Sequence, residues 1–110
     1  MTIAKAEAAL VWCPFPDEAA ARAAVSTLLD ARLIACGNLL PGMTSLFAWQ
    51  GERGESAECG VLLKTTASRL DEAMARLREI HPYTAPAVAG WAVRVDEGTL
   101  AWLKGETTKP

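Results

Sequence analysis

The pattern of apolar and polar positions divides the chain into four expected strands and three expected helices. An uninterrupted apolar run at residues 8–13 predicts a buried strand, and apolar residues at helical spacing predict a helix at 17–31. Further helices are predicted after Thr66 and from Gly98. The remaining strands are predicted at 33–40, with an extended continuation over 43–50, at 55–66 and at 85–95.

Capping, proline and glycine residues set the expected boundaries of these elements. Asp17 brings negative charge to the start of the first long helix, where the helix dipole favours it, and Pro82 stops the second one. Thr66 or Ser68 is expected to cap the start of the second long helix. A glycine-rich turn at 51–54 is expected to join the second and third strands into a long hairpin.

The order of the elements predicts an α+β fold. It reads β-α-β-β-α-β followed by a short helix, which is the order of the ferredoxin-like split βαβ sandwich with a four-stranded antiparallel sheet. A length of 110 residues fits one domain over residues 1–110, with loose tails expected at 1–7 and 104–110. Both long helices should cover the same sheet face. Because 51% of the residues are hydrophobic, the other face is expected to pack against another subunit.

Charge and cysteine content argue against several classes of protein. The net charge of −2 argues against nucleic-acid binding, which needs a basic face. The apolar run 8–12 is too short for a signal sequence or a membrane span, so a cytoplasmic location without membrane association is expected. Cys13, Cys36 and Cys59 form no CxxC pair and indicate free thiols in a reducing compartment.

Residues able to bind a soft metal are expected to meet at one end of the domain. The topology brings together the end of the first strand with Cys13, the helix start with Asp17, and the end of the second long helix with His81 and Tyr83. A thiol beside a helix N-terminus tends toward the thiolate, and an imidazole completes a soft ligand pair for copper. The alternative is that Cys13 is a small buried hydrophobe and His81 a polar helix stop. A third ligand would come from Asp17 or from another subunit.

The other cysteines and one lysine are given different roles. Cys36 is expected at the opposite end as a packed core thiol, and Cys59 in the core of the third strand. Lys64 is a charge inside an apolar strand. It is interpreted either as a snorkelling edge residue or as a contact for an anion or carboxylate in a cleft between subunits.

Two segments carry a resemblance to a known family. The stretches Arg32–Ser45 and His81–Pro86, together with Trp49 and Gly51 of the hairpin, are similar to those of the CutA family of divalent-cation tolerance proteins. The resemblance runs from about Leu10 to Leu103. It implies a non-catalytic, homotrimeric divalent-cation tolerance protein whose partners are a divalent metal ion and copies of itself. It also implies copper binding by Cys13 and His81.

The chain departs from the family pattern near the expected metal ligands. Family members that bind copper can carry a second histidine where this chain has Ile80, and the family usually has Pro-Glu where this chain has Pro86 and Ala87. Ala48 and Gln50 depart from the family hairpin. Each of the first two departures removes a possible ligand and weakens the predicted copper site.

The same topology is compatible with other functions. A PII-like trimeric signalling or scaffold module would bind a small anionic effector or a partner protein in the inter-subunit cleft, and no glycine-rich phosphate loop supports a nucleotide there. Acylphosphatase chemistry needs a Gly-Arg-Val-Gln-Gly loop, which is absent, and a Cys-His nucleophile would lack an orienting group, so no enzyme is predicted. RNA binding by an RRM would need exposed aromatics on the third strand, where 57–63 has none.

Overall fold

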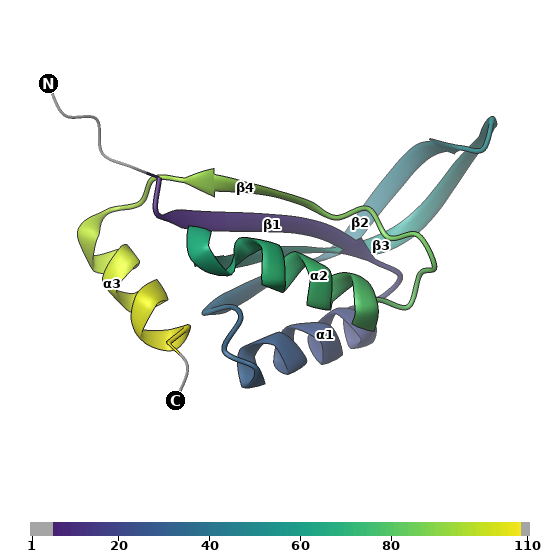
Figure 1. Cartoon of the computed structure of the whole chain (residues 1–110). Helices are drawn as coiled ribbons and strands as arrows, with labels where there is room; N and C mark the ends of the chain where they lie inside the picture. Colours follow the sequence, from purple (N-terminus) through teal and green to yellow (C-terminus); the bar gives the residue numbers. More distant parts are fainter. Residues whose placement is uncertain (1–5, 109–110) are drawn as a thin grey trace, which may run out of the picture.

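The computed structural model describes residues 6–108 and has the predicted α+β architecture (Figure 1). Its four strands form one antiparallel sheet in the order β2-β3-β1-β4, so the ferredoxin-like prediction is confirmed. The elements are β1 (Ala8–Phe15), α1 (Glu18–Asp30), β2 (Cys36–Trp49), β3 (Glu52–Thr66), a 3₁₀ turn η1 (Ala67–Arg69), α2 (Leu70–Ile80), β4 (Ala89–Val93) and α3 (Glu97–Glu106).

The core lies between the sheet and the helices α1 and α2, which lie on the same side of it (Figure 1). Side chains of β1 alternate between two faces, as expected for a strand. Val11, Cys13 and Phe15 are fully buried, whereas the residues between them are only partly buried. Leu28 of α1 and Leu77 of α2 are also fully buried and belong to the same cluster. One sheet face therefore supplies the core, and the opposite face has no helix pair over it.

β2 and β3 continue beyond the sheet as a long two-stranded arm (Figure 1). The turn at its tip is formed by Gln50 and Gly51, with φ angles of 50° and 81°, the combination of a type I′ hairpin turn. The predicted turn at 51–54 therefore started one residue too far along the chain and was too long, because Gly54 is already paired with Phe47. The Phe47 ring lies where a Cβ at residue 54 would be, 2.5 Å from its nearest atoms. Close ring packing explains why glycine occupies that position.

Several predicted boundaries are corrected by the structure. β1 continues through Pro14 to Phe15, and β2 continues through the Pro41–Gly42 bend with a register shift between Leu40 and Met43. β4 is shorter than predicted, since only residues 89–93 pair with β1. No side chain caps η1 or α2, because the hydroxyls of Thr66 and Ser68 bond to each other at 3.1 Å.

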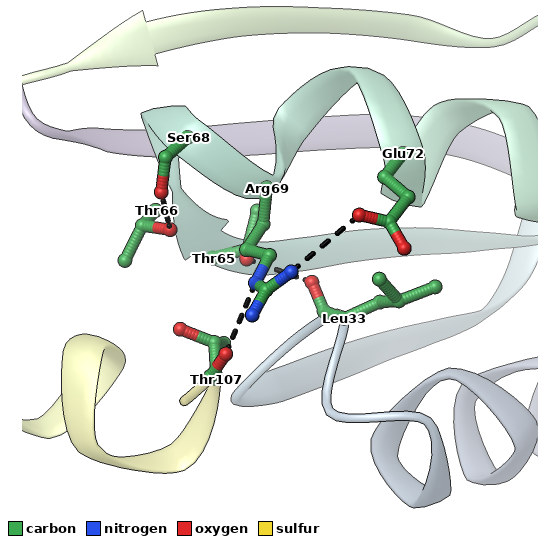
Figure 2. A network of polar contacts seen from close by, with 7 residues as sticks. All are labelled: Leu33, Thr65, Thr66, Ser68, Arg69, Glu72 and Thr107. Atoms are coloured by element: carbon green, nitrogen blue, oxygen red, sulfur yellow. Dashed lines mark hydrogen bonds and ion pairs between the residues drawn. The ribbon is translucent and has the colours of Figure 1, made fainter. Parts of the chain in front are cut away.

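The loose tail predicted from Lys104 begins inside α3, and Thr107 follows the end of that helix (Figure 2). The Arg69 side chain donates from Nε to the Thr107 carbonyl at 3.0 Å, and Thr107 is 3% exposed. Nearby, the Thr65 hydroxyl donates to the Leu33 carbonyl at 2.7 Å. These bonds tie α3, η1 and the entry into β2 together. Of the predicted N-terminal tail, Glu7 accepts a hydrogen bond from the Ala67 N–H at 2.8 Å, and residues 1–5 and 109–110 lie outside the described part.

None of the helices in the described range 6–108 has the length and apolar character needed to cross a membrane.

The end of α1 offers a stabilising substitution. Arg32 has a φ of 57°, and the N–H groups of Arg32 and Leu33 donate to the carbonyls of Leu29 and Leu28, which is the pattern of a Schellman motif. A residue with a Cβ is strained in this conformation. We expect Arg32→Gly to raise the free energy of unfolding by about 0.5 kcal/mol, measured by urea denaturation. Glycine at Arg22, inside α1, is the control and should lower it by about 1 kcal/mol. A lower stability for Arg32→Gly would contradict this account of the motif.

Candidate functional site

Four elements supply the side chains that meet at the end of β1. Cys13 and Phe15 come from β1, Glu58 from β3, His81 is the residue that ends α2, and Tyr83 lies in the loop that follows. We call these five residues the His81 cluster. The predicted convergence of Cys13, His81 and Tyr83 is confirmed by the contacts below.

His81 uses both of its ring nitrogens. Nδ1 accepts the Tyr83 backbone N–H at 3.0 Å, and Nε2 lies 2.8 Å from the Pro14 carbonyl. Because a backbone amide can only donate, Nδ1 carries no proton, and Nε2 therefore donates to Pro14. The ring is 7% exposed and stacks on Phe15 with centroids 4.2 Å apart. His81 thus joins the end of β1 to the loop after α2.

Cys13 lies fully buried beside the same carbonyl. Its Sγ is 3.7 Å from the Pro14 oxygen, so the thiol and the imidazole both direct a hydrogen to one acceptor. Burial, followed by the negative charge of Glu58, raises the pKa of the Cys13 thiol to about 12, although the charge of Arg78 acts in the opposite direction. The expected tendency toward the thiolate was therefore wrong. Desolvation disfavours the charged thiolate more strongly than the positive charge of Arg78 favours it.

Tyr83 connects the cluster to the base of the arm. Its hydroxyl donates to Glu58 Oε2 at 2.8 Å, and its ring is tilted against His81 with centroids 4.9 Å apart. Desolvation, followed by the hydrogen bond to Glu58 and its charge, raises the pKa of Tyr83 to about 12. Glu58 was not predicted as a site residue. The signal was available in the strand register, because Phe15 at the end of β1 pairs with Cys59 and Glu58 comes one position further on.

The cluster contains both predicted metal ligands, Cys13 and His81, but it does not complete a set of three. Within residues 6–108, no group of three or more His, Cys, Asp or Glu side chains is placed to hold a metal ion. Asp17, a predicted third ligand, caps α1 by accepting the Ala20 N–H at 2.8 Å. Ile80 packs against the apolar core instead of presenting a ligand, and Ala87 is exposed. A single described chain therefore places Cys13 and His81 together without completing a larger ligand set.

The remaining predicted residues lie elsewhere. Cys59 is 2% exposed and belongs to the core, as expected. Cys36 is only partly buried at the start of β2, with its Sγ 3.6 Å from Oδ1 of Asn38, so its prediction as a packed core thiol was wrong. Lys64 is partly buried in β3, and Trp49 is 57% exposed on the arm.

Known proteins are similar to this chain in both sequence and fold. Residues 9–106 match the family model described as CutA1 divalent ion tolerance protein. The chain is 41% identical over 101 residues to the divalent-cation tolerance protein CutA of Pyrococcus horikoshii, covering 91% of this chain and 98% of that protein. It is 39% identical over 95 residues to CutA of Thermus thermophilus, covering 84% and 90%. The crystal structure of CutA1 from Ehrlichia chaffeensis matches with a TM-score of 0.88 at 28% identity, over 94% of this chain and 97% of that one.

Proposed function

The chain belongs to the CutA1 divalent ion tolerance family, and we propose that it is a non-catalytic homotrimer that binds copper through Cys13 and His81. One observation carries the copper assignment: the thiol and the imidazole converge on the Pro14 carbonyl, at 3.7 and 2.8 Å. Thiolate and imidazole are soft ligands, and thiolate favours Cu(I) over harder ions. Cu(I) also accepts few ligands, which suits a cluster that offers two.

The hydrogen bonds of the cluster define what binding requires of these residues. Cys13 must lose its proton, and His81 must expose the lone pair of one ring nitrogen. If Nε2 becomes the ligand, the ring proton moves to Nδ1, and the Tyr83 N–H then loses its acceptor. Occupation of the site would therefore loosen the loop after α2. The proposal includes this local rearrangement.

The test is a Cu(I) titration of the reduced, metal-free protein, followed with a chromophoric competitor. We expect saturation at about one copper per chain, because each chain contributes one Cys13–His81 pair. Weak, non-saturating binding would contradict the proposal.

The trimer is supported by apolar surface that one chain leaves exposed. Leu46, Phe47 and Trp49 on the arm are 65%, 44% and 57% exposed, and Trp91 on β4 is 44% exposed. Large apolar side chains that one chain leaves exposed suit an interface between subunits.

We expect the mass in solution to be that of three chains, and the melting temperature to rise with protein concentration. The physical reason is that dissociation accompanies unfolding, so mass action favours the folded assembly. Light scattering and thermal denaturation over about a hundredfold range of concentration measure both properties. A monomeric mass with a melting temperature independent of concentration would refute the assembly.

A second candidate function is a PII-like signalling or scaffold module that binds a small anionic effector. Its support is Lys64 of β3, which pairs with Cys36 of β2 and Leu10 of β1 and is absent from the ion pairs found within residues 6–108. No copper is involved in this function, so the two candidates are tested separately.

A further inference from the structure

A cavity of about 490 Å³ lies between η1 and the C-terminal end of α3. Within the described residues its lining is entirely polar or charged, with two cations and no acidic side chain: Thr66, Ser68, Arg69, Lys104, Thr107 and Thr108. Figure 2 shows most of these residues around the bond between Arg69 and Thr107. In Figure 1, α3 lies at the end of the molecule away from the arm. The apolar residues assigned above to the subunit interface are not among these six.

The Arg69 guanidinium is held in place at this cavity. Its Nε donates to the Thr107 carbonyl at 3.0 Å, and its side chain is only 18% exposed. Nη1 lies 3.5 Å from Oε1 of Glu72, which is long for a charge-assisted hydrogen bond. A guanidinium carries more N–H donors than these two bonds use, and no other bond within residues 6–108 engages the rest. Arg69 therefore retains donors for a further acceptor.

Lys104 of α3 supplies the second cation. Its Nζ lies 3.5 Å from Oε1 of Glu7, and the two side chains are 56% and 52% exposed. An ion pair that is this exposed contributes little to stability, because solvent screens it. An incoming anion can therefore replace Glu7 at low cost.

The hydroxyls of Thr66 and Ser68 add a neutral donor. Their oxygens are 3.1 Å apart, so one of the two hydroxyls donates to the other. Each hydroxyl carries one hydrogen, and the pair therefore keeps one O–H for an acceptor outside it. The hydroxyls of Thr107 and Thr108 donate instead to α3 carbonyls, at 2.7 and 2.6 Å. The cavity thus offers two cations and one hydroxyl donor to a bound group.

We propose that this cavity binds a phosphate group, as inorganic phosphate or a small phosphate monoester, through Arg69, Lys104 and the Thr66–Ser68 hydroxyl pair. A phosphate group carries a charge of about −1.5 to −2 at neutral pH, so it matches two cations better than a single carboxylate does. The described lining holds no aromatic ring, and a nucleotide base would therefore have no stacking partner there.

The phosphate site is separate from both candidate functions. Thr66 pairs with Ala8 at the start of β1, whereas Cys13 of the copper site lies near the other end of that strand. The lining residues all come from one chain, so the site does not require a cleft between subunits. The proposal therefore rests neither on copper binding nor on Lys64.

The test is a phosphate titration of the metal-free, full-length protein at constant ionic strength, followed by the backbone amide NMR signals of Ser68 and Thr108. We expect saturable binding of about one phosphate per chain with a Kd of about 1 mM, and binding of acetate at least about tenfold weaker. Lys104→Met should weaken phosphate binding about tenfold, because it removes one of the two cations. Arg22→Met is the matched control. It removes a cation from another exposed ion pair, on α1, and should bind phosphate as the native protein does.

Glu7→Gln tests the site in the opposite direction. It removes the carboxylate that competes for Lys104 and should strengthen phosphate binding about threefold. Glycerol 3-phosphate distinguishes the two sources of the group: an affinity above that of inorganic phosphate identifies a monoester, and an equal or lower affinity identifies phosphate itself. Absence of saturable phosphate binding to the native protein would overturn the proposal, and so would equal affinity in the native protein and Lys104→Met.

Discussion

The His81→Ala variant is expected to lose about 3 kcal/mol of unfolding free energy. The substitution removes a buried ring that stacks on Phe15 and leaves two backbone groups, the Pro14 carbonyl and the Tyr83 N–H, without their partners. A buried polar group without a partner costs about 1–3 kcal/mol, and the lost ring contact adds to this. The effect is predicted from the metal-free structure and is independent of copper.

Urea denaturation at one fixed protein concentration measures this loss, since the stability of an oligomer depends on concentration. Tyr83→Phe is the control in the same cluster. It removes only the hydroxyl bond to Glu58, which is partly exposed, and should cost less than about 1 kcal/mol. A loss below about 1 kcal/mol for His81→Ala would show that the ring does not hold β1 to the loop. A ¹⁵N NMR measurement of the ring gives an independent test, because we expect the proton on Nε2.

The position of the cluster could be predicted from sequence because each of its main residues lies at an element boundary. Cys13 is near the end of an apolar run, and His81 stands directly before a helix-stopping proline. Once the element order indicated a ferredoxin-like fold, those two boundaries had to lie at the same end of the sheet. No side-chain detail was needed for that conclusion.

The chemistry of the cluster could not be predicted in the same way. The protonation of Cys13 depends on its desolvation in the folded core and on the charges of Glu58 and Arg78 near it. Glu58 joins the site only through the β1–β3 register. The ordering of Thr107 likewise depends on Arg69, which is 38 positions away in the sequence. Each of these features is a long-range contact that no local pattern contains.

Copper binding is expected to weaken at least about a hundredfold in Cys13→Ala, because removing a thiolate from a two-ligand site leaves only an imidazole. Alanine is chosen because Cys13 is fully buried and a small apolar side chain keeps most of its packing. Cys36→Ala is the matched control. It removes a thiol at the start of β2, where Cys36 pairs with Lys64 of β3, and should leave copper affinity unchanged.

The native site also carries a pH signature that the variant should lose. The folded pKa of Cys13 is raised to about 12, so the thiol is protonated at neutral pH and copper must displace that proton. Below this pKa, the thiolate fraction grows about tenfold for each pH unit, and the affinity should rise with it between about pH 6 and 8. Competition titrations at several pH values measure the slope. An unchanged affinity in Cys13→Ala would remove Cys13 from the ligand set, whereas a loss in Cys36→Ala alone would move the site to the start of β2.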